Sequence, residues 1–198
     1  SGLLRMAAAE FSYYGGVSHN IPGGSDGRQA DFDRSRAGAE ADYTIVRYGM
    51  NYTRAFRSDW QVRLGFNGQY TSDSLVAGEQ YGLGGPDTVR GYLLREISND
   101  RGYAGQFELD TPDLAPGMGL SDRHRARVIA FYDYGAVQRN NALPGEVAHE
   151  TLASAGTGIR FSYTKSVVLR FDVANILQPA GTRQTGDWRI SSALALIF

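Results

Sequence analysis

Side chains suited to acid–base or nucleophilic catalysis are sparse in this sequence. All three histidines fall in segments predicted to be loops: His19, His124 and His149. Neither Ser18-His19 nor Asp122-Arg123-His124 supplies the nucleophile, base and orienting group of a catalytic constellation. No G-x-S-x-G or H-E-x-x-H motif is present, and the lack of cysteine removes thiol catalysis and cysteine-ligated metals. We therefore predict no enzymatic activity, no metal site and no cofactor.

Charged side chains in the middle of extended segments are more informative. Arg63, Arg170 and Asp172 each stand between two large apolar neighbours in the sequence. A charge in such a place is tolerated when its side of the strand meets water or an opposite charge. The chemistry to be explained is therefore ion pairing on one face of a set of strands, with apolar contact on the other face.

The strands that must position these charges are visible as a period of two. Between 60 and 71, one parity carries the large apolar side chains Trp60, Val62, Leu64, Phe66 and Tyr70. The other parity carries Gln61, Arg63, Asn67 and Gln69. This alternation predicts a β-strand rather than a helix, and it recurs in 151–163, 166–177 and 188–198. Less regular strands are predicted at 3–14, 42–56, 102–110 and 125–136, which gives about eight in all.

Composition favours a membrane β-barrel over other classes of protein. The 198 residues include 25 glycines, 12 tyrosines and 9 phenylalanines, which suits strands, turns and aromatic girdles. The mean hydropathy of −0.34 is compatible with a barrel, because lumen-facing polar residues dilute the apolar signal. A net charge of −1 offers no basic footprint for nucleic acid. The predicted fold class is all-β, a transmembrane antiparallel β-barrel, and the alternative is a soluble β-sandwich.

The connections between the predicted strands alternate in length. Arg57-Ser58-Asp59 and the Thr164-Lys165 corner are tight, whereas 15–41, 72–101 and 137–150 are long and polar. Short periplasmic turns and long external loops are typical of outer-membrane barrels. Residues 111–124 depart from this rule, because they are long where a short turn is expected.

Eight strands raise the question of closure. An open sheet in lipid would expose unpaired backbone groups at its two edges, so we expect closure of the strands on themselves or pairing with a second chain. An eight-stranded barrel has an interior about wide enough for side chains alone. Such a compact barrel would have a structural role without transport activity.

Four segments, taken in order, carry a family resemblance. Leu83-Gly84-Gly85-Pro86 leads into Val89-Arg90-Gly91-Tyr92, and Asp100-Arg101-Gly102-Tyr103 follows. Phe131-Tyr132-Asp133-Tyr134-Gly135 then has the form F-x-D-x-G, and the chain ends in Phe198. This series resembles the two-partner secretion transporters, the TpsB family of haemolysin activator/secretion proteins. These belong to the superfamily that also holds the BamA-type outer-membrane assembly proteins.

The resemblance covers most of residues 60–198 and, loosely, the first 59. Family members carry a plug helix and two POTRA domains before a sixteen-stranded barrel. The resemblance therefore implies that this chain is the C-terminal half of such a barrel, a fragment without POTRA domains that forms one membrane domain over residues 1–198. It also implies that the long loop at 72–101 folds back into the lumen, and that Phe198 matches the aromatic end presented to the barrel assembly machinery.

An arginine at the tip of a loop inserted into a barrel is costly to desolvate unless a carboxylate meets it. On the strand at 125–136, Phe131 and Asp133 share one face, and Val128, Ala130, Tyr132 and Tyr134 share the other. If the second set faces lipid, Asp133 points into the lumen. We predict that Arg90 pairs with Asp133, with Glu108 or Asp110 on the neighbouring strand as a second partner. Gly91 would allow a close approach of the backbone at the tip.

The function implied by the resemblance is transport of a protein across the bacterial outer membrane. The expected partners are outer-membrane lipid, a secreted exoprotein and the barrel assembly machinery, with no role for nucleic acid. The loop motif Val89, Arg90, Gly91 and Tyr92 is expected to stabilise or gate the lumen. The alternatives are the compact structural barrel and a BamA-type assembly factor.

Overall fold

The computed structural model of the chain describes residues 1–25, 27–164 and 166–197. Lys165, in the predicted corner, and Phe198, the predicted assembly signal, lie outside the described residues. Among the described residues, no helix combines the length and the apolar composition of a membrane span. The elements, in chain order, are β1 (Gly2–Met6), β2 (Ala9–His19), α1 (Gln29–Ser35), β3 (Thr44–Ala55), β4 (Gln61–Tyr70), β5 (Tyr81–Leu83), β6 (Ile97–Asn99), β7 (Arg101–Asp110), a 3-10 turn (Pro116–Met118), β8 (His124–Gln138), β9 (His149–Tyr163), β10 (Val167–Ile176) and β11 (Trp188–Leu196).

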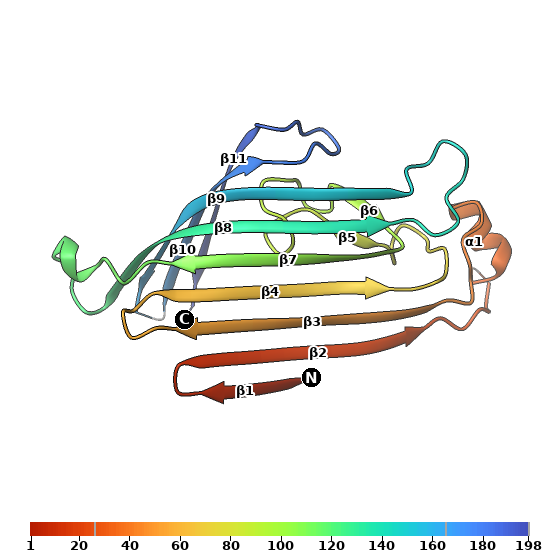
Figure 1. Cartoon of the computed structure of the whole chain (residues 1–198). Coiled ribbons are helices and arrows are strands. Elements are labelled where there is room, and N and C mark those ends of the chain that lie inside the picture. Colours follow the sequence, from red (N-terminus) through yellow and green to blue (C-terminus); the bar gives the residue numbers. More distant parts are fainter. Residues whose placement is uncertain (26, 165, 198) are drawn as a thin grey trace.

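Nine of the strands form one curved antiparallel sheet (Figure 1). They are ordered β1-β2-β3-β4-β7-β8-β9-β10-β11, so each strand pairs with the next along the chain except where β5 and β6 intervene. These two short strands pair only with each other. The predicted all-β fold is confirmed. The sandwich alternative is wrong, because the nine strands share one sheet instead of two facing ones.

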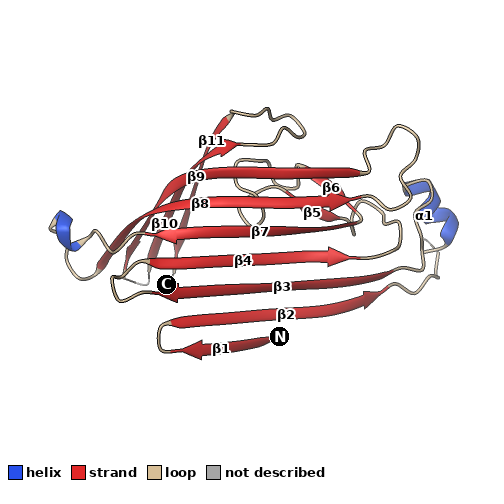
Figure 2. Cartoon of the chain, in the orientation of Figure 1, coloured by secondary structure: helices blue, strands red, loops and turns tan. Residues whose placement is uncertain are grey.

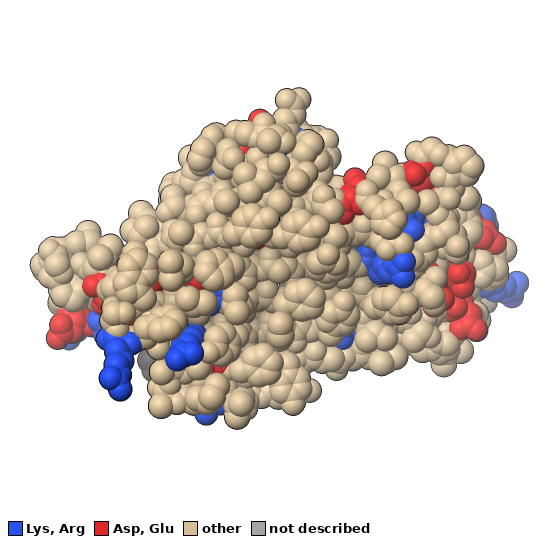
Figure 3. Space-filling model, in the orientation of Figure 1, with Lys and Arg blue, Asp and Glu red and all other residues tan. Residues whose placement is uncertain are grey.

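The two faces of this sheet differ in composition. Its convex face carries exposed large apolar side chains, among them Met50, Leu64, Phe107, Tyr132 and Leu194. Figure 3 shows this outer surface nearly free of charge along the middle of the strands, with Arg, Asp and Glu gathered at the two ends. An apolar band of this size between charged rims is the surface that a bilayer covers. The parities read from the sequence are confirmed, since Phe131 and Asp133 are buried on the concave face.

Strand number and closure differ from the prediction. The single strand expected at 3–14 is a hairpin, in which β1 and β2 pair through Met6↔Ala9 and turn at residues 7–8. A run of alanines carries no Gly or Pro turn signal, so the turn was invisible in the sequence. The sheet therefore has nine strands. Among the described residues β1 and β11 are unpaired edges, so the closed eight-stranded alternative is wrong and closure needs further strands.

The long connection at 111–124 has a physical explanation in the structure. Its Asp113 accepts hydrogen bonds from the backbone N–H of Ala115 and Ala126, and its own N–H donates to Asp59 Oδ2 at 2.8 Å. Arg127 in turn binds the Asp59 carboxylate. The connection thus folds back onto the β3–β4 turn. Figure 2 shows the helices at the two ends of the sheet, with this segment at the short-turn end and α1 at the long-loop end.

The long loop at 72–101 lies on the concave side of the sheet. It contains the β5–β6 hairpin, and Arg101 already belongs to β7. Buried apolar residues of the hairpin pack against β7, β8, β9 and β10 in one cluster, composed of Leu83, Val89, Tyr92, Ile97, Ala104, Val137, Leu152 and Ile176. The core of the molecule is therefore the contact between this hairpin and the sheet's inner wall.

Candidate functional site

The candidate site is the tip of the β5–β6 hairpin and the wall that it touches. Val89 is fully buried, and Arg90 and Tyr92 keep only 6% and 2% of their surface exposed. No residue of the tip pairs in the main sheet, so its position depends on side-chain contacts. A buried arginine is stable only when its donors are satisfied. Its partners therefore define the site.

Arg90 is bound on two sides by carboxylates. Its Nε donates to Asp133 Oδ2 at 2.7 Å and its Nη2 to Asp133 Oδ1 at 2.8 Å, which is a bidentate pair. The backbone N–H of Arg90 also donates to Asp133 Oδ2, at 3.0 Å. Nη1 donates to Glu108 Oε2 at 2.7 Å. The structure therefore brings together Arg90, Asp133 and Glu108 as the sequence predicted.

The F-x-D-x-G motif of β8 supplies three successive positions on the concave face. The guanidinium carbon of Arg90 lies 3.7 Å from the centroid of the Phe131 ring, a cation–π contact. Asp133 provides the carboxylate. A Cβ at Gly135 would collide with the side chain of Leu83 in the hairpin. Each residue of the motif thus contacts the hairpin, because residues two apart in a strand share a face.

Gly91 is a position of the tip that requires glycine. Its φ of 93° lies in the region that favours glycine. A Cβ there would lie 2.8 Å from Ile176 Cδ1 and 3.0 Å from Ala174 Cβ on β10. The backbone of the tip is therefore pressed directly against the wall, as the predicted close approach required.

Glu108 connects the tip to two further strands. Its Oε2 also accepts from Arg160 Nη2 on β9 at 3.0 Å, and Arg160 Nη1 donates to Asp172 Oδ1 on β10 at 2.6 Å. The chain of charges therefore runs from the loop through β7 and β9 to β10. The sequence pattern marked Asp172 as a mid-strand charge, but it linked neither Asp172 nor Arg160 to Arg90.

Asp110 is not a partner of Arg90. It faces the same side as Glu108, but its Oδ2 lies 3.1 Å from Arg63 Nη2 on β4, without hydrogen-bond geometry. The prediction of Glu108 or Asp110 as the second partner is therefore resolved in favour of Glu108. Parity places both carboxylates on one face, and only the position of the tip along the strands separates them.

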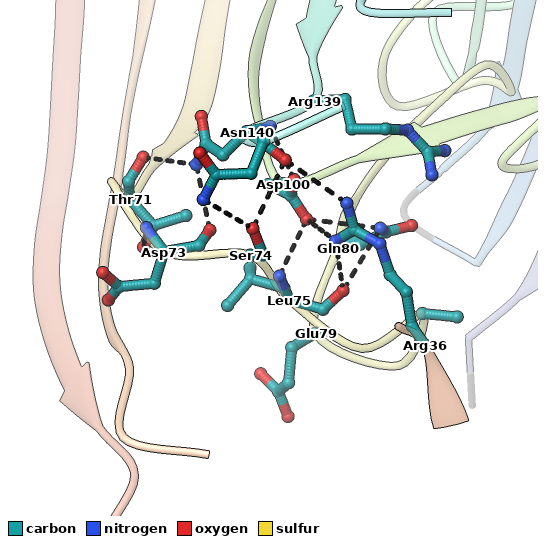
Figure 4. A network of polar contacts seen from close by, with 12 residues as sticks. Arg36, Thr71, Asp73, Ser74, Leu75, Glu79, Gln80, Asp100, Arg139 and Asn140 are labelled. Atoms are coloured by element: carbon teal, nitrogen blue, oxygen red, sulfur yellow. Dashed lines mark hydrogen bonds and ion pairs between the residues drawn. The ribbon is translucent and has the colours of Figure 1, made fainter. Parts of the chain in front are cut away.

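Sequence reasoning missed a second polar cluster, at the long-loop end of the sheet (Figure 4). Its centre is Asp100, which is fully buried immediately before β7. Asp100 Oδ1 accepts from Arg36 Nη1 at 2.7 Å, from the Leu75 N–H at 2.9 Å and from Gln80 Nε2 at 3.3 Å. Oδ2 accepts from the Asn140 N–H at 2.7 Å.

These donors come from three connections that are distant in the sequence. Arg36 follows α1, Leu75 and Gln80 precede β5, and Asn140 follows β8. The Asn140 side chain also donates to the carbonyls of Thr71 and Asp73. Asp100 therefore connects the long loops to one another at the long-loop end of the sheet. The only signal in the sequence was its place in the Asp-Arg-Gly-Tyr segment, which indicated a resemblance but no contact.

Comparison with known proteins gives a consistent result. The profile of the family described as haemolysin secretion/activation protein ShlB/FhaC/HecB matches residues 4–161. CdiB from Escherichia coli superposes with a TM-score of 0.75 at 18% identity, over 98% of this chain and 34% of that one. CdiB from Acinetobacter baumannii superposes with a TM-score of 0.68 at 22% identity, over 98% and 31%. The chain thus spans about a third of each structure, and at these identities the likeness shows the fold alone. No curated protein matches by sequence.

Proposed function

The chain belongs to the family of haemolysin secretion/activation proteins ShlB/FhaC/HecB, and from this membership we propose that it forms part of the wall of an outer-membrane barrel that exports a secreted protein partner. The convex apolar band supports contact with lipid, and the concave polar face supports an aqueous lumen. The unpaired edges β1 and β11 are the places where further strands would complete the wall.

One observation carries this proposal. The tip of the hairpin sits inside the curve of the sheet and is held there by the buried Arg90–Asp133–Glu108 cluster. A packed core would not need three charges at the same place, because apolar residues of similar volume are usually at least as stable. A charged, hydrogen-bonded anchor is specific and can be released, which suits a loop that controls the width of a lumen. We therefore assign Val89, Arg90, Gly91 and Tyr92 the role of positioning that loop, with Asp133 and Glu108 as its lumen partners.

Export measured with a variant of the anchor tests this role. In the full-length transporter, Arg90→Ala should lower export of the secreted partner by about tenfold or more, since Asp133 then loses its charged partner and both side-chain hydrogen bonds and keeps only the backbone N–H of residue 90. Arg90→Lys keeps the charge but not the bidentate fork, so its export should lie between that of the wild type and that of Arg90→Ala. Export of partner by Arg90→Ala at the wild-type rate, with normal amounts of folded barrel in the membrane, would refute the role of the loop.

A further inference from the structure

The concave wall on the short-turn side of the hairpin tip is rich in arginine. A hollow of about 1020 Å³ lies between the tip and this part of the wall. Among the described residues, the charged side chains that line it are Arg63, Arg90, Arg125, Arg127, Arg160, Arg170, Arg189, Asp87, Glu108 and Asp172. The hollow is therefore basic, although the net charge of the whole chain is −1.

Three of these arginines stand side by side across neighbouring strands. Arg127 of β8 is directly opposite Arg160 of β9, which is directly opposite Arg170 of β10. Like charges in such positions repel each other and destabilise a sheet. Arg127 is compensated by Asp59, and Arg160 by Glu108 and Asp172. Within residues 1–25, 27–164 and 166–197, no ion pair or hydrogen bond compensates the side chain of Arg170.

Arg189 of β11 is the second uncompensated cation of the hollow. It lies opposite Ala174, on the same concave face. Its Nη1 is buried and has no hydrogen-bond partner among the described residues. A buried donor without an acceptor is unusual in a folded protein and indicates that an acceptor is supplied from elsewhere. Apart from Arg170 and Arg189, each arginine that lines the hollow has a carboxylate partner in the described part of the chain.

The spacing of the two arginines along the sheet restricts the kind of ligand that can contact both. Ala174 is opposite Arg189 and lies four residues beyond Arg170 along β10, so the two levels are about 13 Å apart at the rise of a β-strand. Two anionic groups, one for each level, match this spacing better than a single phosphate or carboxylate. An extended polypeptide bridges it when acidic side chains stand at positions i and i+4, because these lie on one face at the same spacing.

We propose that Arg170 and Arg189 form a binding surface for an extended, acid-containing polypeptide segment inside the lumen. This rests on the proposed function as an export barrel and names the substrate class that its wall receives: segments in transit with carboxylates four residues apart. The hairpin tip bounds the surface on one side, since Arg90 and Gly91 line the same hollow. A segment that enters from the short-turn end therefore meets Arg170 first, and then reaches the level of Ala174, where Arg189 and the anchored tip both lie.

Block of the channel current by peptides tests the proposal in the full-length transporter. The probes are a synthetic peptide with glutamates at i and i+4 in a serine and glycine background, and the same peptide with glutamine. The variant is Arg170→Gln with Arg189→Gln, which exposes no carboxylate of the described residues because none of them pairs with either arginine. The matched control is Arg57→Gln with Arg123→Gln, which removes the same charge from connections outside the hollow.

The double variant should weaken block by the glutamate peptide about tenfold, as two lost charge contacts predict. It should leave the weak block by the glutamine peptide unchanged, and the control variant should behave like wild type. Arg170→Lys should retain most of the affinity, which excludes a general disturbance of the barrel. Equal affinity of the double variant and the wild type for the glutamate peptide would overturn the proposal. Equally strong block by inorganic phosphate at the same molarity would also overturn it, since the proposal requires two carboxylates on one chain.

Failure of this inference is distinguishable from failure of the export function. Conductance and export of the partner protein are measured on the wild type in parallel. A wild type that conducts and exports while the double variant binds the glutamate peptide normally refutes only the arginine surface. If the wild type neither conducts nor exports, the export function fails, and fluorescence anisotropy of labelled peptides with the detergent-solubilised protein still decides whether the two arginines bind acidic chains.

Discussion

Asp133 and Asp100 are both fully buried carboxylates that bind an arginine, yet they obtain their hydrogen bonds in different ways. Every hydrogen bond described for Asp133 comes from Arg90, through Nε, Nη2 and the backbone N–H. Asp100 receives one from Arg36 and the others from two backbone N–H groups and Gln80. The first carboxylate depends on one residue of one loop, whereas the second is shared by three connections.

The two clusters are therefore suited to different tasks. Release of the hairpin tip would leave Asp133 without any of its described donors, so a partly released tip is unfavourable. This suits an anchor with two states, bound and released. Loss of any one donor leaves Asp100 mostly satisfied, so that cluster tolerates local change and keeps the long loops together. A buried carboxylate with several independent donors is a structural junction, and one with a single donor residue can act as a switch.

The largest difference between the two clusters is expected when Arg90 or Arg36 is replaced by alanine. Arg90→Ala should reduce the free energy of unfolding by about 3–5 kcal/mol, because it leaves Asp133 buried without a charged partner and with the backbone N–H of residue 90 as its one remaining donor among those described. Arg36→Ala should cost only about 1 kcal/mol, because three donors to Asp100 remain. The temperature at which the folded band of the full-length transporter disappears in a detergent gel measures both. Equal shifts for the two variants would show that the number of remaining donors does not matter.

Replacement of Gly91 by alanine should distinguish the contribution of packing at the tip from the contribution of the Arg90 ion pairs to stability. Gly91→Ala keeps the Arg90 cluster but requires a positive φ and a Cβ within 2.8 Å of Ile176 and 3.0 Å of Ala174. We expect a loss of about 2 kcal/mol from these two costs. The same measurement applies, with Gly78→Ala as the control, since nothing lies within 4 Å of its Cβ position. A neutral Gly91→Ala would show that the tip rests away from β10.

The smallest effect is expected at the exposed pair between the β3–β4 turn and the connection at 111–124. The Asp113 N–H and Arg127, which donate to the Asp59 carboxylate, lower the pKa of Asp59 below its ordinary value. A lowered pKa contributes stability that is present above the unfolded value of about 3.9 and is lost as the pH falls through the folded value. Docking of this connection should therefore persist from pH 7 to 5 and weaken only below about pH 4, at a cost under about 1 kcal/mol.

A spin label at Met118→Cys reports this docking through its mobility. In Asp59→Asn the part of the low-pH change that comes from Asp59 should disappear, whereas the Asp113 carboxylate, whose pKa is also lowered, still titrates in the same connection. An undocking transition near neutral pH would contradict the assignment and point to another group. This exposed pair should therefore contribute less to stability than either buried cluster, because water competes for its charges.

The sequence alone was sufficient for most strands of the main sheet and for which side of each strand a residue faces. Alternation with a period of two is a local property, so Val62, Leu64 and Phe66 could be assigned to one face without knowledge of their neighbours. The same parity placed Asp133 with Phe131 on the inner side. The family resemblance then added the expectation that Arg90 meets them there. The hairpin at residues 7–8 escaped because alanines end one strand and start another without a turn signal.

Which charges form ion pairs depends on the tertiary structure. Glu108 and Asp110 share a strand and a face, and the depth of the hairpin tip selects Glu108. Arg36 and Asp100 are 64 residues apart, and their contact depends on how three connections fold over one another, which no local pattern encodes. The uncompensated Arg170 and Arg189 are likewise visible only from their register with neighbouring strands. Side-chain periodicity follows from the geometry of one strand, whereas ion pairs depend on distances between segments that only the folded chain brings together.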